Sequence, residues 1–139
     1  MLEERSQLLS QLEKSFRNVF RTFRKDINEL FSEYMPGNEF SVLQQLNMKS
    51  PQMASELARE MKVSSSHITA VTDRLIKKEM VTRKRDEVDR RIVRLEITEK
   101  GKETAKHMEE LRSQYYIKKF EHLSNHEIKT MLELFNRLI

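Results

Sequence analysis

The hydrophobic residues in the first quarter of the chain recur every three or four positions. The set comprises Leu9, Leu12, Phe16, Val19, Phe20, Phe23, Ile27, Leu30, Phe31 and Tyr34. This period places them on one face of a helix, which Pro36-Gly37 ends. The helix would span roughly 25 residues and about 40 Å. Because this length exceeds what a compact domain needs, we expect the apolar face to pack against a second chain.

Three shorter helices are predicted between residues 38 and 78. Asn38 is expected to cap the first, and Ser50-Pro51 supplies a cap and a first-turn proline for the second. Ser64 or Ser65 then caps the third. The expected buried rows are, in order, Phe40, Val42, Leu43 and Leu46; Leu57, Ala58 and Met61; and Ile68, Val71 and Leu75.

After Met80 the hydrophobic period changes to two, which predicts strands. Two alternating segments flank the charged residues 85–90, so we expect a two-stranded hairpin with a basic tip. Thr98 is expected to cap a long helix, and the capping box Ser124-Asn-His-Glu127 begins the last one. The inner faces of these two helices are predicted to be Ala105, Met108, Leu111, Tyr115 and Phe120, and Ile128, Met131, Leu132, Phe135 and Leu138.

The charge of the chain is concentrated in one segment. Residues 74–94 carry nine Lys or Arg against four acidic residues, a net of +5, which leaves −1 for the rest of a chain whose net charge is +4. A basic block on a balanced protein is typical of a surface that binds a polyanion. From charge alone, an ordinary solvated surface fits equally well.

Composition excludes several classes of site. The chain has no cysteine, so it forms no disulfide, thiolate metal site or thiol switch. His122 and His126 are four residues apart, but the capping box separates them, and we expect no metal and no cofactor. No catalytic motif is present, so we expect no enzyme. The charged start of the chain and the lack of a long apolar run predict a cytoplasmic protein with no membrane partner.

Two short helices, a serine-rich turn and a hairpin together form the pattern of a helix-turn-helix with a wing. The second helix of such a pair enters the major groove of DNA with its N-terminal residues first. Its expected outward face comprises Ser65, Ser66, Thr69, Thr72 and Asp73, with His67 in the first turn. Hydroxyl groups there can bind phosphates or base edges. One serine is needed as a cap, and three in a row exceed that need.

These residues also carry a family pattern. The motifs are Ser55-Glu-Leu-Ala58, Val63-Ser-Ser-Ser66, Thr72-Asp-Arg-Leu75-Ile-Lys-Lys78, and Arg83-x5-Asp89-x-Arg91-x5-Ile97-Thr98-Glu-Lys-Gly101. Over residues 55–101 the chain resembles the multiple-antibiotic-resistance regulator (MarR) family. The resemblance implies a homodimer joined through its terminal helices, a palindromic double-stranded DNA operator, and in many members a small-molecule effector. The family commonly has Gly where this chain has Glu79.

The expected fold is therefore mainly α (α+β), as a single domain over residues 1–139. Residues 38–98 would form the winged helix-turn-helix, with residues 1–35 and 99–139 as dimerisation helices. Family wings insert an arginine into the minor groove, a role that suits Arg90 or Arg91. Asp89 would stiffen the wing by pairing with Arg91 or Arg83, and Arg74 would bind a phosphate or tie its helix to the wing. The full expected DNA-binding set is Ser64, Ser65, Ser66, His67, Thr69, Thr72, Arg74, Arg83, Arg85, Arg90 and Arg91.

We thus expect a sequence-specific transcriptional regulator that acts as a dimeric repressor and is relieved by a small ligand. The alternative is a helical interaction protein whose basic hairpin binds acidic surfaces without sequence preference. True operators exceed random DNA in affinity by about 10³ or more. That ratio distinguishes the two.

Overall fold

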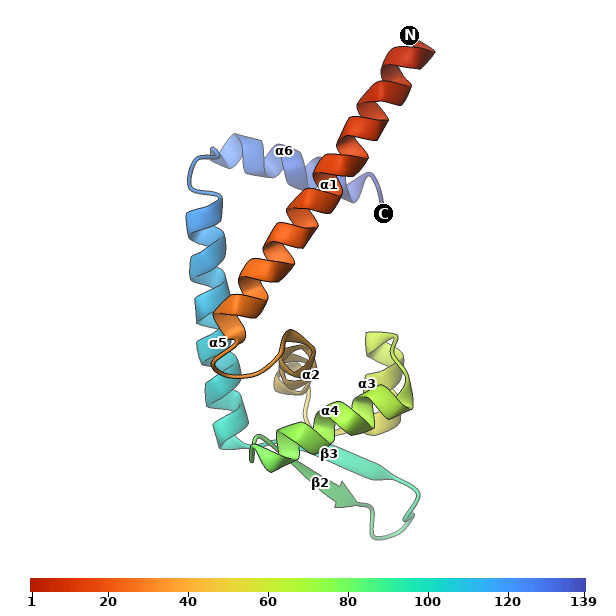
Figure 1. Cartoon of the computed structure of the whole chain (residues 1–139). Coiled ribbons are helices and arrows are strands. Elements are labelled where there is room, and N and C mark those ends of the chain that lie inside the picture. The colour runs from red at the N-terminus through yellow and green to blue at the C-terminus, as the bar shows by residue number, and fades with distance from the viewer.

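A computed structural model describes all residues, 1–139, and shows two parts joined by long helices (Figure 1). The lower part holds short helices and a small sheet, and the upper part is a frame of three helices. In chain order the elements are α1 (Leu2–Phe31), α2 (Gly37–Met48), β1 (Gln52–Met53), α3 (Ala54–Met61), α4 (Ser65–Lys77), β2 (Val81–Arg85), β3 (Val93–Ile97), α5 (Glu99–Lys119) and α6 (Asn125–Asn136).

The hydrophobic core lies in the lower part, where α2, α3 and α4 pack on the sheet and on the adjoining ends of α1 and α5. Helix α4 contributes its predicted row Ile68, Val71 and Leu75, all fully buried. Ala105 and Met108 of α5 close the core from the other side. The apolar periods of the short helices are therefore confirmed as core-facing.

The sheet has three strands rather than the two that were predicted. Its order is β1-β3-β2, and both pairings are antiparallel. The missed strand, β1, pairs Gln52 with Leu95. It is only two residues long, too short for an alternating pattern to reveal it.

Two predicted helix starts are wrong. Helix α2 begins one residue before Asn38, and its N-cap is Pro36. Helix α3 begins at Ala54, because Pro51 leads into β1 rather than into a first helical turn. Ser50 caps nothing there. Its hydroxyl instead accepts a hydrogen bond from the backbone N–H of Ile97 at 3.0 Å, which anchors β3.

Two helices end in residues with left-handed backbone conformation. Lys62 ends α3 with φ 56°, and Glu79 follows α4 with φ 62°. After α4 the N–H of Met80 donates to Leu75 and that of Glu79 to Ile76, which is the hydrogen-bond pattern of a Schellman motif. The position where the family commonly has Gly thus keeps its left-handed geometry here with a glutamate.

The base of the wing requires a glycine for close packing. Thr98 caps α5 by accepting a hydrogen bond from the N–H of Gly101 at 3.0 Å, as predicted. A Cβ at Gly101 would lie 2.3 Å from the carbonyl oxygen of Met80. The Thr-x-x-Gly pattern therefore reflects the contact between the first turn of α5 and the strand that starts the wing.

The upper frame leaves a large apolar surface uncovered. Residues 2–22 of α1 are all exposed, and Leu9, Leu12 and Phe20 are 53–58% accessible. On α6, Leu132 and Phe135 are also exposed, and Phe135 contacts Phe16 of α1 edge to face. Figure 1 shows α6 crossing α1, with the N-terminal turns of α1 projecting beyond it. None of the helices combines the length and apolarity needed to cross a membrane.

Candidate nucleic-acid interface

The N-terminal end of α4 is exposed and rich in hydroxyl groups. Ser64 caps the helix by accepting a hydrogen bond from the N–H of His67 at 3.1 Å, and its oxygen lies 3.1 Å from that of Ser66. Thr69 donates to the carbonyl oxygen of Ser65 and remains exposed. Ser64, Ser65, Ser66 and Thr69 thus form an exposed cluster, with His67 half-buried beside them.

Thr72 does not lie on the outward face, and that prediction is wrong. Its side chain is buried, and its hydroxyl donates to the carbonyl oxygen of Ile68 at 2.7 Å. The hydroxyl oxygen of Thr72 in turn accepts a hydrogen bond from Arg83, whose guanidinium also binds Asp73 at 2.6 Å. Arg83 therefore joins β2 to α4, and the contact between helix and wing runs through Arg83 and Asp73.

Arg74 does not make the predicted contact with the wing. Its Nε lies 3.2 Å from a carboxylate oxygen of Glu39, so it ties α4 to α2 rather than to the wing. Lys78 binds the other oxygen of the same carboxylate. Glu39 was missed in the sequence because a single glutamate in a first helical turn is indistinguishable from ordinary helix-start chemistry.

The tip of the wing is ordered by two aspartates. Asp89 accepts two hydrogen bonds from the Arg91 guanidinium, at 3.0 and 3.1 Å, and one from the Arg91 backbone N–H. The predicted pairing of Asp89 with Arg91 is thus confirmed, whereas Arg83 pairs elsewhere. Asp86, which the sequence analysis missed, accepts from the N–H of Asp89 at 2.9 Å, and Arg85 donates to the carbonyl oxygen of Arg90.

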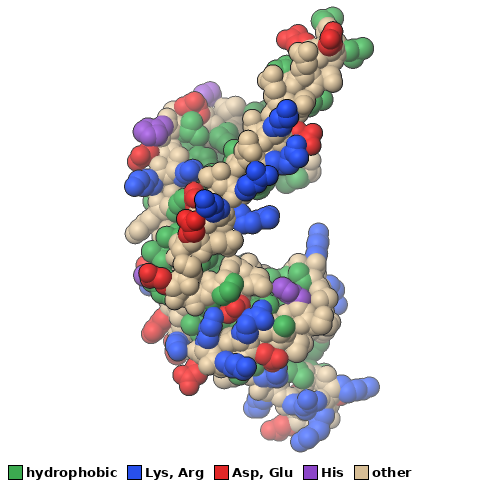
Figure 2. Space-filling view, viewed as in Figure 1, with side chains coloured by type: hydrophobic (Ala, Val, Ile, Leu, Met, Phe, Trp, Pro, Cys, Tyr) green, Lys and Arg blue, Asp and Glu red, His purple; other side chains and the backbone are tan.

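The electrostatics of the tip follow from this pairing. The Arg91 guanidinium, and after it the Arg91 backbone N–H, lower the pKa of Asp89, and the same contact raises the pKa of Arg91. Arg91 remains 91% exposed despite the pairing. Arg90 and Lys84 make no ion pair at all and are exposed. Figure 2 shows Lys and Arg side chains gathered over the hairpin at the bottom of the molecule.

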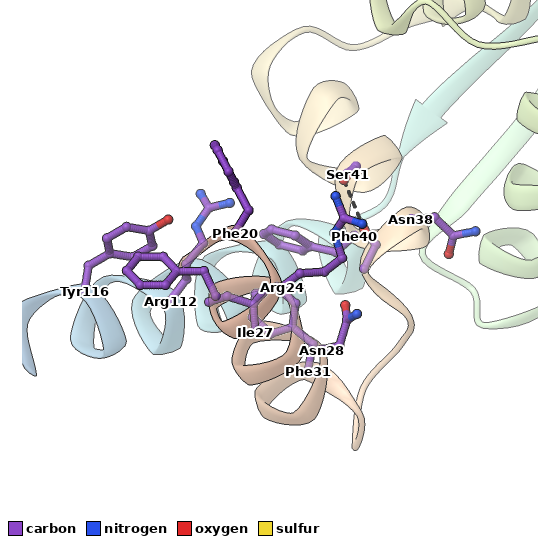
Figure 3. A pocket seen from close by; sticks show the side chains of 12 residues that line it. Phe20, Arg24, Ile27, Asn28, Phe31, Asn38, Phe40, Ser41, Arg112 and Tyr116 are labelled. Atoms are coloured by element: carbon purple, nitrogen blue, oxygen red, sulfur yellow. Dashed lines mark hydrogen bonds between the residues drawn. The ribbon is translucent and has the colours of Figure 1, made fainter. Parts of the chain in front are cut away.

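A groove of about 530 Å³ separates the upper helices from the lower part. Figure 3 shows it lined by aromatic side chains from α1, α2 and α5, including Phe20, Phe40 and Tyr116. Its only charged lining residues are Arg24 and Arg112. Arg112 lies 5.3 Å from the centre of the Phe40 ring and 3.9 Å from a carboxylate oxygen of Glu109, whereas Arg24 has no acidic partner. The groove therefore combines apolar, largely aromatic walls with two positively charged side chains.

The four histidines do not come together. His122 lies in the turn between α5 and α6 and His126 in the first turn of α6, because the predicted capping box begins α6 at Asn125. His107 binds the hydroxyl of Tyr34 at 2.7 Å, far from His67 on α4. No group of three His, Asp or Glu side chains is arranged to hold a metal ion.

Comparison with known sequences places this arrangement among regulators. A model of the MarR family matches residues 36–93, from the start of α2 to the start of β3. The uncharacterised HTH-type transcriptional regulator YpoP of Bacillus subtilis is 39% identical over 137 residues, covering 99% of this chain and 97% of that protein. The interaction protein without operator DNA, considered above as the alternative, has no support among these relatives.

Solved structures share the fold over nearly the whole chain. A MarR family protein from Bacillus stearothermophilus superposes with a TM-score of 0.82 at 25% identity, covering 96% of this chain and 94% of that one. A MarR variant from E. coli, complexed with operator DNA, gives a TM-score of 0.77 at 22% identity, with coverage of 93% and 94%. The winged-helix architecture predicted from the sequence is thus confirmed.

Proposed function

We propose that this chain, which belongs to the MarR family of transcriptional regulators, is a homodimeric repressor of a palindromic operator and carries out no reaction of its own. Residues 38–98 would form its DNA-binding part, and residues 1–35 and 99–139 its dimerisation helices. One observation carries the proposal: the ion pair between Arg83 and Asp73 joins α4, whose N-terminal end is exposed, to the wing that carries the exposed Arg90 and Arg91.

The proposed DNA contacts divide into two kinds. The hydroxyl cluster of Ser64, Ser65, Ser66 and Thr69, with His67, would face the major groove, and Arg90 and Arg91 the minor groove. Arg85 and Arg83 act within the protein: Arg85 binds the carbonyl oxygen of Arg90 in the wing, and Arg83 binds Asp73 of α4. Thr72 and Arg74 are left out of this set because their partners lie inside the protein.

The dimer is proposed from the uncovered apolar surface. The stripe on α1 from Leu9 to Phe20 and the exposed side chains of α6 lie on the same frame of helices. A surface of this kind is typical of a protein interface rather than of a monomer. Sedimentation at micromolar concentration should give twice the 16.7 kDa of one chain. A monomer under those conditions would contradict both the dimer and the palindromic operator.

The DNA contacts are tested by salt-dependent titration on a duplex selected from genomic fragments. Arg91→Ala should weaken binding by about 1–3 kcal/mol and reduce the slope of log K against log salt by about one per half-site. Ser66→Ala should leave the slope unchanged and relax the preference among base pairs. Lys129→Ala, which removes the same charge from exposed α6, should change neither. Unchanged slope and affinity in Arg91→Ala and Arg90→Ala would refute the wing assignment.

We also propose that the groove between α1, α2 and α5 binds an amphipathic aromatic acid as effector. Aromatic walls favour a flat apolar body, and Arg24 and Arg112 favour a carboxylate. A ligand that binds the DNA-incompetent state more tightly shifts the dimer away from the operator. The probe is 2-naphthoate, with 2-naphthylmethanol as the neutral control. Equal thermal stabilisation by both compounds, or by neither, would contradict a cationic effector site.

A further inference from the structure

A buried carboxylate joins the first turn of α2 to the last turn of α4. The Glu39 side chain is only 3% exposed, and its two oxygens bind two different cations. Oε2 accepts from Nε of Arg74 at 3.2 Å, and Oε1 accepts from Nζ of Lys78 at 2.7 Å. Burying a carboxylate this deeply is costly unless its charge is paired and hydrogen-bonded, and here each oxygen has a cationic partner. Both cations are therefore part of the packing between α2 and α4.

The two cations mark the place where the recognition helix ends. Arg74 and Lys78 are four residues apart on one face of α4, and Lys78 is its C-cap residue. The next residue, Glu79, turns the chain toward β2 and the wing. Glu39 thus holds the C-terminal end of α4 at the junction between the two elements that enter the DNA grooves.

We propose that Glu39 is a positioning residue for operator binding, which orients α4 on α2 through Arg74 and Lys78. The proposal rests on the proposed function as a DNA-binding regulator and adds a role for three residues in it. Arg74 and Lys78 then affect the operator only through Glu39. Neither makes a phosphate contact of its own, although both belong to the basic segment of the sequence.

The positioning role and a simple charge effect change affinity in opposite directions. Removing an acidic side chain from a DNA-binding domain reduces its repulsion of phosphates, so electrostatics alone makes Glu39→Gln bind more tightly. Loss of positioning makes it bind more weakly, because α4 no longer fits the major groove. The sequence-specific part of the affinity should fall most, since nonspecific binding depends on charge and not on the fit of α4.

The experiment titrates the full-length dimer with the selected operator and with a random duplex, at three salt concentrations. Glu39→Gln should lower operator affinity about tenfold or more and leave random-duplex affinity within about twofold. Lys78→Gln should lower operator affinity without changing the salt slope, and the double variant should bind no more weakly than Glu39→Gln alone. Glu96→Gln, which removes an exposed and unpaired acid from β3, is the matched control and should strengthen binding slightly.

The outcomes distinguish a failure of the proposed function from a failure of the positioning role. If the unmodified protein shows no preference for any duplex, the proposed function fails. If the unmodified protein does prefer the operator, and Glu39→Gln binds that operator as well or better, the positioning role is overturned. Equal losses on both duplexes, or a salt slope reduced by about one per half-site in Lys78→Gln, overturn it as well. Should Glu39→Gln fail to fold, the salt slope of the half-exposed Lys78 variant decides the question.

Discussion

Replacement of Glu79 by glycine should stabilise the protein. Glu79 has φ 62° in the turn between α4 and the wing, and a residue with a Cβ is strained there by roughly 1–2 kcal/mol. Glycine has more freedom to lose on folding, which offsets roughly 0.5–1 kcal/mol of the gain. The net stabilisation should be about 0.5–1 kcal/mol. The bond from Thr98 to the backbone carbonyl of residue 79, 2.8 Å long, is kept in the variant.

Thermal unfolding at fixed protein concentration measures this effect. At ~2.1 cal/mol/K per residue, a chain of 139 residues has an unfolding entropy of roughly 0.3 kcal/mol/K. The midpoint should therefore rise by about 2–3 °C. Concentration has to be held constant because association adds to the apparent stability.

Two control variants separate backbone strain from charge. Glu79→Ala keeps a Cβ but removes a carboxylate from the negative end of the α4 dipole, which is worth about 0.3 kcal/mol. Lys62→Gly relieves the same strain after α3, where φ is 56°, and should stabilise in the same direction. If Glu79→Gly proves no more stable than Glu79→Ala, the left-handed backbone carries no strain and the reasoning is wrong.

Four further predictions concern the helical frame and the core. Ser124→Ala should destabilise the protein by about 1 kcal/mol, because it removes the α6 cap. The backbone N–H of Ser124 lowers the pKa of Glu127. The contribution of Glu127 to stability is therefore present at neutral pH and is lost as the pH falls below the ordinary pKa of a glutamate, which urea titrations at pH 7 and pH 3 measure. Burial and a hydrogen bond to Asp26 of α1 raise the pKa of Tyr115 to about 12, so stability is lost as the pH rises from 10 to 12. In a titration of tyrosine ionisation followed at 295 nm, Tyr115→Phe should remove the step at the highest pH. Leu46→Ala should destabilise the core by about 3 kcal/mol in urea denaturation, whereas Val88→Ala, at a 96% exposed wing residue, should have no effect.

The sequence predicted those features that depend on local chemistry. Ser64, Thr98 and Ser124 cap the helices they were expected to cap, because each has its accepting oxygen and the N–H three residues on within one short segment. The hairpin was predicted for the same reason, since its two strands alternate in hydrophobicity and are joined directly. Glu79 was recognised as a departure from the family, and its backbone kept the family's geometry.

Features that depend on distant partners were missed. Strand β1 exists because Gln52 pairs with Leu95, more than forty residues away, and two residues give no period of their own. Thr72 was assigned outward because it is polar, yet a hydroxyl can be buried in a helix when it donates to its own backbone. Arg74 was assigned to DNA or the wing for its charge, and only the folded chain brings Glu39 to it.

The exposure of residues 1–22 has a consequence for the order in which the protein is made and folds. These turns of α1 leave the ribosome before the winged-helix core, but none of their residues is buried within their own chain. A helix in a protein gains most of its stability from tertiary packing, because its nucleation is costly, and little packing supports these turns. The winged-helix core, whose contacts come from residues 31–108, can fold as soon as α5 is synthesised. An element that is translated before the core is therefore the last to become ordered, and in the proposed dimer its folding waits for α6 and for a second chain.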